Sequence, residues 1–168
     1  MIRATRATDL PESIPELSAA LDACAGVAVN IEIKNDRGEP DFDVTDWVVD
    51  RAAVEIVRRG APARWLMSSF RPATVDRWRR VVPAARTAVL TYHADEVTIA
   101  GVAAAGHVAI HPWVDRLDEA AVRRAHSLGL AVNVWTCDDP DRMRELMSWG
   151  VDGICTNVPD VALDVRRR

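Results

Sequence analysis

Several features that would quickly assign a function are missing from this sequence. The three cysteines, Cys24, Cys137 and Cys155, have no CxxC or Cys/His spacing, which argues against a zinc site or a disulfide framework. No apolar run approaches the roughly 18 residues that a membrane-spanning helix needs. The first 20 residues also lack the apolar core of a secretory signal. We therefore expect a cytoplasmic protein without a membrane span.

Charge of one sign is not concentrated anywhere in the 168 residues. Arginine and Asp/Glu are mixed along the chain, and the formal net charge is −4, so no basic stripe indicates nucleic-acid binding. The terminal Arg166–Arg168 run is typical of a solvated helix end. The segment Asn35–Gly38, after the first expected strand, is not a glycine-rich phosphate loop. These absences argue against a nucleic-acid-binding protein and against a protein with a glycine-rich phosphate-binding loop.

What the sequence does contain is a regular alternation of strand and helix signals. Its strand signals are mostly continuous apolar or β-branched runs, which are typical of strands buried on both faces of a parallel sheet. The expected strands are Val27–Lys34, Arg64–Phe70, Arg86–Tyr92, His107–Trp113, Ala131–Cys137 and Gly153–Asn157.

Helices are expected between these strands, with start signals that can be read from the sequence. Ser13 opens a capping box with Glu16, Asp46 can cap the next helix, and Asp139-Pro140 starts a later one. No linker or composition shift divides the chain, so we predict a single domain over residues 1–168.

Strand–helix alternation implies parallel strands joined by right-handed crossovers, and two architectures have this pattern. One is a (β/α) barrel, and the other is an open doubly wound sheet. A complete eightfold barrel takes about 250 residues and one βαβ unit about 30, so this chain has room for between about five and six units. The strand count alone favours the open sheet, and the motifs described next favour the barrel.

The first expected strand ends in a charged pair, Glu32 and Lys34. An i, i+2 spacing directs both side chains to one side of a strand. The carboxyl ends of strands are where barrel active sites lie. Two ordinary charges at a surface strand end would give the same pattern, so both interpretations stay open at this point.

The last third of the chain carries more specific strings in a fixed order. Ile110-His111-Pro112 comes first, Val132-Asn133-Val134-Trp135-Thr136 follows, and the stretch from Gly150 to Asp160 reads GVDGICTNVPD. This order resembles the closing part of the glycerophosphodiester phosphodiesterase family, in which a Trp-Thr strand precedes a Gly-Val-Asp-Gly-Ile strand and a Thr-Asp/Asn-x-Pro turn. Ser68-Ser69-Phe70 is similar to the Ser-Phe strand end of that family. The resemblance covers nearly the whole chain.

The resemblance implies an α/β fold, an incomplete TIM barrel of about six parallel strands with helices outside. The family hydrolyses glycerophosphodiesters, which are small molecules, to glycerol 3-phosphate and an alcohol, and uses a divalent cation, calcium or magnesium. The resemblance further implies that Glu32 is a metal ligand, that Lys34 lies near the phosphate, and that Trp135 lines the glycerol pocket. A hard cation of this kind prefers several carboxylate oxygens.

The family also has a His-Arg-Gly after its first strand, a Glu-x-Asp, and a His-Asp pair after its second strand. No histidine precedes His93 here, and no His-Arg-Gly occurs. We therefore expect a chain that lacks the two amino-terminal β/α units, has no catalytic residue, and is inactive by itself. One carboxylate is not expected to retain the cation.

Two further expectations come from this interpretation. A non-catalytic phosphodiester-binding or scaffold protein derived from the same fold is the alternative function. Missing strands would leave sheet edges exposed, so we also expect self-association through those edges.

The remaining aromatic residues and histidines are expected to have structural roles. We expect His111 to hold the turn after its strand, and a contact with substrate is the alternative for this residue. We expect His107 to lie on the surface, and Trp47 to pack in the core with the other tryptophans of helices and strand starts. Trp113, at a strand end, is a second candidate for the pocket.

Overall fold

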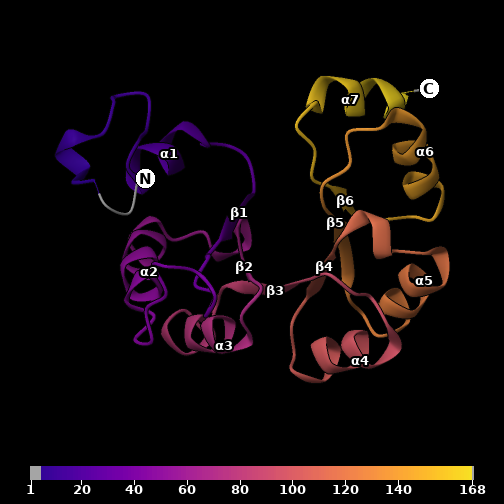
Figure 1. The fold of residues 1–168 in the computed structure, drawn as a ribbon, viewed down its shortest axis with the longest axis horizontal. Coiled ribbons are helices and arrows are strands. Elements are labelled where there is room, and N and C mark those ends of the chain that lie inside the picture. The colour runs from indigo at the N-terminus through magenta and orange to yellow at the C-terminus, as the bar shows by residue number, and fades with distance from the viewer. Residues whose placement is uncertain (1–4, 168) are drawn as a thin grey trace. The chain divides into compact units, whose positions relative to one another are not determined.

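The computed structural model describes residues 5–167, which form a succession of strands and helices (Figure 1). The chain divides into two compact units, Met1–Arg86 and Thr87–Arg168. The strands are β1 (Val29–Glu32), β2 (Trp65–Ser69), β3 (Arg86–Thr91), β4 (Ala109–Pro112), β5 (Ala131–Val134) and β6 (Gly153–Ile154). The α-helices are α1 (Leu17–Ala23), α2 (Trp47–Arg59), α3 (Pro72–Val81), α4 (Glu96–Ala104), α5 (Glu119–Ser127), α6 (Pro140–Ser148) and α7 (Pro159–Arg167). Among the described residues the short 3₁₀ turns are η2 (Ala7–Asp9), η3 (Pro62–Arg64) and η4 (Val114–Arg116).

The predicted fold class, an incomplete TIM barrel with six parallel strands, is confirmed. Within the first unit β1 pairs in parallel with β2, and within the second unit β3 to β6 pair in parallel in chain order. This order is that of a (β/α) barrel, whereas a doubly wound sheet reverses direction at a switch point. Each predicted strand is present but is shorter than its apolar run at one or both ends. No described helix is long and apolar enough to cross a bilayer.

The core of the first unit lies between its two strands and the helices α2 and α3. Ile31, Trp65 and Met67 from the strands are buried there together with Ile56 and Trp78 from the helices. Burying a side chain of this size contributes roughly 1.5–3 kcal/mol. Successive strand residues point to opposite faces, so the neighbours of these core residues point away from the helices.

The core of the second unit is built in the same way. Ile110, Val132 and Val134 from the strands pack with Met143 and Leu146 of α6. Helices α4, α5 and α6 follow strands β3, β4 and β5, as a repeated β/α unit requires (Figure 1). The opposite strand faces of this unit are therefore left for other side chains.

The predicted helix starts are partly confirmed. Asp139 caps α6 by accepting a hydrogen bond from the backbone N–H of Arg142 at 2.8 Å, as expected. The capping box at Ser13 is wrong, because α1 begins only at Leu17; the preceding segment instead closes a turn, in which the N–H of Ile14 donates to the carbonyl of Pro11.

Asp46 precedes α2 as predicted, but its carboxylate does not cap the helix. It lies in the left-handed region with φ 51°, and its side chain accepts hydrogen bonds from Arg71, Asn35 and Thr74. Asp43 takes over the capping role, since its carboxylate accepts from the N–H of Trp47 at 3.0 Å. The sequence placed a carboxylate correctly before the helix but could not show that two were competing for the role.

The Asp46–Arg71 pair connects the start of α2 to the start of α3. Both side chains are largely buried, with 7% and 14% exposed. The Asp50–Arg77 pair also joins α2 to α3, but its side chains are 45% and 35% exposed. The same two helices are thus linked by one buried and one exposed ion pair, which provides a direct comparison.

We predict that Asp46→Asn lowers the free energy of unfolding by about 3 kcal/mol, because it leaves the buried Arg71 guanidinium without a counter-charge. The matched Asp50→Asn change is expected to cost less than about 1 kcal/mol, since exposed pairs contribute little. Urea denaturation of the three proteins measures both values. Equal losses for the two variants would contradict this assignment.

Candidate functional site

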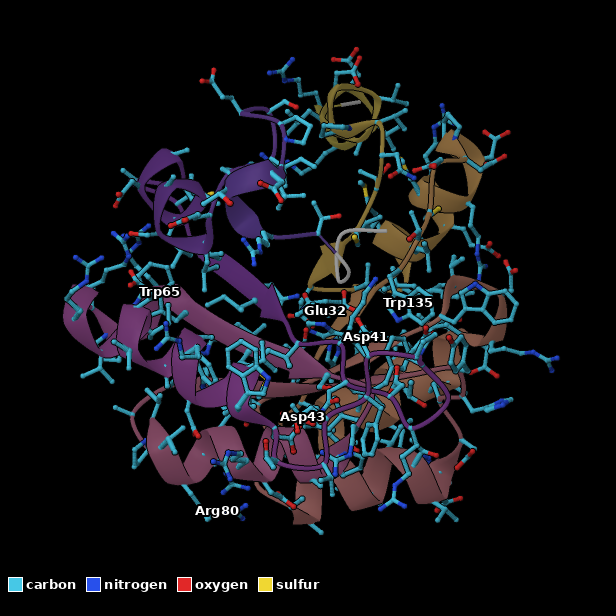
Figure 2. All side chains as sticks on the ribbon, turned by 60° about the vertical axis from the view of Figure 1, so that its left-hand side comes forward. Glu32, Asp41, Asp43, Trp65, Arg80 and Trp135 are labelled. Carbon is cyan, nitrogen blue, oxygen red and sulfur yellow. The ribbon has the colours of Figure 1, made fainter. Side chains whose placement is uncertain are left out.

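The carboxyl end of β1 carries the charged pair that the sequence indicated. Ile31 and Ile33 are buried in the core against the helices, so Glu32 points to the opposite face of the strand (Figure 2). The Lys34 ammonium lies 3.9 Å from Glu32 Oε1, and the lysine side chain is 77% exposed. An exposed pair at this distance contributes little to stability. Lys34 is therefore able to turn toward an anionic ligand at small cost.

Ser68 is a polar residue of this region that sequence reasoning undervalued. It pairs with Glu32 in the β1–β2 register, so both lie on the face that points away from the helices. Ser68 is fully buried, and its hydroxyl has no hydrogen-bond partner among residues 5–167. Ser69, next to it, donates to the carbonyl of Ile33 at 2.7 Å. A buried hydroxyl without a partner costs about 1–3 kcal/mol, so Ser68 is a polar group in need of one.

The loop that follows β1 is acidic, but its carboxylates do not converge on Glu32. Asp43, in that loop (Figure 2), is occupied by Thr45 and by the cap of α2. The hydrogen bond from the Thr45 hydroxyl, followed by the backbone N–H bonds, lowers the pKa of Asp43 below its usual value. Within the described part of the chain no three Asp, Glu, His or Cys side chains gather in a way that could hold a metal ion. The residues present therefore do not fit a divalent cation by themselves.

In the second unit Trp135 follows β5 and is held firmly in place. Its indole N–H donates to the carbonyl of His111 at 2.7 Å, and its backbone carbonyl accepts from Val114 at 2.7 Å. The Tyr92 ring lies edge-on to it, with centroids 5.5 Å apart. Trp135 is thus a pre-positioned aromatic wall at the strand end where the sequence placed a substrate contact.

A partly buried polar pair lies next to Trp135. His111 and Asn133 occupy adjacent strands, and the amide nitrogen of Asn133 lies 2.9 Å from Nε2 of His111. Burial lowers the pKa of His111 to about 4. The sequence predicts that His111 holds the turn after its strand. In the structure the His111 side chain is only 5% exposed, and its ring pairs with Asn133 on the neighbouring strand.

Gly153 on β6 makes room for this pair. A Cβ atom at this position would lie 2.5 Å from the Oδ1 atom of Asn133, so any side chain here would force the Asn133 amide to shift. The second glycine of the Gly-Val-Asp-Gly-Ile string therefore leaves the Asn133 amide free to keep its place beside His111.

Two other expectations are contradicted by the geometry. His107 is wrong as a surface residue, because it is buried and hydrogen-bonded through Nδ1 to the Thr87 hydroxyl at 3.0 Å. Trp47 is wrong as a core residue, because it is 57% exposed on the first turn of α2. Cys137 is buried and free, and burial raises the pKa of its thiol, whereas Cys155 is exposed.

Asp138 explains the Thr-Asn-x-Pro string at the start of α7. Its carboxylate accepts hydrogen bonds from the Thr156 hydroxyl and from both the backbone and the side chain of Asn157, each at 2.8 Å. These bonds, the Asn157 side chain first, lower the pKa of Asp138. The turn after β6 is thereby tied to the loop after β5.

The parallel β/α order and the strand-end residues define a protein of the (β/α)-barrel class. The model of the glycerophosphoryl diester phosphodiesterase family matches residues 2–161. The chain therefore belongs to the glycerophosphoryl diester phosphodiesterase family, as the sequence resemblance predicted.

Individual relatives agree with this membership. The chain is 46% identical over 46 residues, 27% of its length and 17% of the relative, to "Probable glycerophosphodiester phosphodiesterase 2" of Mycobacterium tuberculosis. It superposes on a family structure from Silicibacter pomeroyi DSS-3 with a TM-score of 0.79 and 28% identity, covering 90% of this chain and 55% of that one.

A third comparison shows the fold alone. An Oleispira antarctica phosphodiesterase, solved in complex with the product sn-glycerol-3-phosphate, matches with a TM-score of 0.80 and 16% identity, over 92% of this chain and 62% of that one. The chain thus spans less than two thirds of the length of these solved relatives.

We predict a pH dependence of stability from His111. Its pKa of about 4 in the folded protein lies below the ordinary value of 6.5, so the unfolded chain binds the proton more readily. The stabilisation is therefore fully present above pH 6.5 and is lost as the pH falls toward 4, up to about 3 kcal/mol in total.

Urea denaturation between pH 4.5 and 7.5 tests this prediction. His111→Gln should flatten the pH dependence, because the amide cannot titrate. His126→Gln is the control, since His126 is partly exposed and paired with Asp152. An unchanged slope in His111→Gln would show that another group is responsible.

Proposed function

We propose that residues 1–168 form one glycerophosphodiester phosphodiesterase-like domain that binds the phosphate and glycerol parts of a glycerophosphodiester. Hydrolysis to glycerol 3-phosphate and an alcohol, with a divalent cation, is the reaction of the family. The observation that carries the proposal is the family match over residues 2–161 together with Glu32 and Lys34 at the carboxyl end of β1.

Each residue has a distinct proposed role. Lys34 attracts the phosphate as an exposed point charge, and Trp135 covers the apolar edge of the glycerol with its ring. Glu32 is the proposed cation ligand of the family. Lys34 is the only lysine of the chain, since every other one of the 21 basic residues is arginine. The residue proposed to attract the phosphate is thus also the only compact ammonium side chain of the sequence.

We further propose that the 168-residue polypeptide by itself binds without turnover. A single carboxylate next to an ammonium is a poor site for a hard cation, which prefers several oxygen ligands. The alternative function, a non-catalytic phosphodiester-binding protein, differs from the first in physiological role rather than in what these residues bind.

An activity assay shows whether the polypeptide hydrolyses a glycerophosphodiester or only binds it. The purified polypeptide is expected to release no glycerol 3-phosphate from glycerophosphocholine above the buffer rate, with or without calcium or magnesium. Release would be followed by coupling to glycerol-3-phosphate dehydrogenase. Cation-dependent release that disappears in Glu32→Gln would contradict the inactivity and would place Glu32 in the catalytic machinery.

A binding experiment tests the proposed roles directly. We expect glycerol 3-phosphate to bind in titration calorimetry, and Lys34→Ala and Trp135→Ala each to weaken it about tenfold, the effect of losing a charge-assisted or a well-packed aromatic contact. Without added cation, Glu32→Gln should strengthen binding, because it removes a negative charge near the anion.

The controls use the same residue types elsewhere. Arg123→Ala on α5 removes an exposed positive charge, and Trp47→Ala removes an exposed tryptophan. Both should leave the affinity unchanged. Reductive ¹³C-methylation also labels Lys34 as the only side-chain amine, so its NMR signal should move on titration with glycerol 3-phosphate. A Lys34 signal that does not move, with equal affinity in Lys34→Ala, would refute its role.

Self-association stays a prediction. β1 and β6 are the two ends of the strand order, and unpaired strand edges pair readily with other chains. Light scattering during gel filtration should give a mass above 18.5 kDa that rises with concentration. Asn30→Lys, which adds a charge to β1, should lower that mass. A single-chain mass at every concentration would contradict the prediction.

A further inference from the structure

Aromatic side chains are scarce in this chain, and three of them form one row. Phe, Trp and Tyr make up only 5% of the residues, and tyrosine occurs once. Tyr92, Trp113 and Trp135 each stand directly after a strand, β3, β4 and β5 in turn. The ladder sets them side by side, because Thr91 pairs with Pro112 and Trp113 forms a bridge with Trp135.

Within this aromatic row the Tyr92 ring stands nearly at right angles to each of the two indole rings. Tyr92 and Trp113 have centroids 6.4 Å apart with an interplanar angle of 77°. Tyr92 and Trp135 have centroids 5.5 Å apart at 75°. Tyr92 is 56% exposed, so its ring can be reached from solvent. The row is a corner of aromatic walls in which Tyr92 is the exposed ring, whereas Trp113 is partly buried and packs against the apolar core of the second unit.

The backbone holds the row in position before any ligand binds. The N–H of Trp113 donates to the carbonyl of Thr91 at 3.0 Å, and the N–H of Trp135 donates to the carbonyl of Pro112 at 3.1 Å. The indole of Trp135 is anchored on His111. Pre-positioned walls reduce the entropy that a ligand must lose on binding.

Such a corner suits one chemical class of ligand in particular. The faces of aromatic rings carry negative charge density and attract cations, and several rings around one point are the usual receptor for quaternary ammonium groups. A primary ammonium needs several directed hydrogen-bond acceptors, which the faces of aromatic rings do not provide. A trimethylammonium group has no N–H to donate, so it loses nothing between such rings.

We propose that Tyr92, Trp113 and Trp135 form a subsite for a quaternary ammonium group. This inference rests on the proposed function and deepens it, because it names the alcohol of the preferred diester as choline. Trp135 borders both the glycerol and the choline, whereas Tyr92 and Trp113 contact the choline alone.

The test uses the complete chain and tetramethylammonium chloride as the probe. Incorporated 3-fluorotyrosine gives a single ¹⁹F signal, because Tyr92 is the only tyrosine. We expect a saturable shift of this signal with tetramethylammonium and none with ammonium chloride at equal ionic strength. Tyr92→Leu and Trp113→Leu, followed by calorimetry, should weaken binding about fivefold each.

Matched variants separate recognition from folding. Tyr92→Phe keeps the ring and should retain the affinity, and Trp47→Leu removes a distant exposed tryptophan and should leave it unchanged. Wild-type protein should bind glycerophosphocholine about fivefold more tightly than glycerophosphoethanolamine, and Tyr92→Leu should lose that preference.

The outcomes for the two proposals are distinct. Binding of glycerol 3-phosphate without any saturable response to tetramethylammonium would overturn the subsite and leave the proposed function standing. A saturable response that depends on Tyr92, with no binding of glycerol 3-phosphate, would support the subsite and overturn the proposed function. If Trp47→Leu weakened tetramethylammonium binding as much as Tyr92→Leu does, the binding would be non-specific and the subsite would be refuted.

Discussion

The pleat of the parallel strands is the constraint on which the chemistry of both units depends. Helices cover one face of the strands, so every second strand residue enters an apolar core and the residues between them do not. Glu32 and Ser68 lie on the second face in the first unit, and His111 and Asn133 do so in the second. Polar groups that would be costly in the apolar cores therefore lie on the strand faces that point away from the helices.

Much of the fold could be predicted because a buried parallel strand is legible as an apolar run. All six strands were expected, and so was the capping role of Asp139. The error in the cap of α2 arises because two nearby side chains can fill the same role, and the local sequence does not show which of them does. Asp46 and Asp43 both qualify as caps, and only the tertiary position of Arg71 decides that Asp46 is used elsewhere.

The positions of the candidate residues in the fold could be predicted from the sequence, but their contacts could not. Glu32, Lys34 and Trp135 could be placed at strand ends from their strings alone. The partners of these residues depend on the register between strands, which no single strand specifies. Tyr92 had no motif around it, although its position directly after a strand was a usable signal. Ser68 was noted only as part of the Ser-Phe strand end, and its unpaired hydroxyl could be seen only in the structure.

The absence of a side chain at Gly153 has an effect on the neighbouring strands. An amide nitrogen can only donate a proton, so Asn133 leaves Nε2 of His111 as the acceptor and places the proton of the neutral imidazole on Nδ1. A methyl group at position 153 would displace that amide and release the ring from its tautomer. The glycine at position 153 on β6 thus sets the tautomer of the His111 imidazole on β4, two strands away.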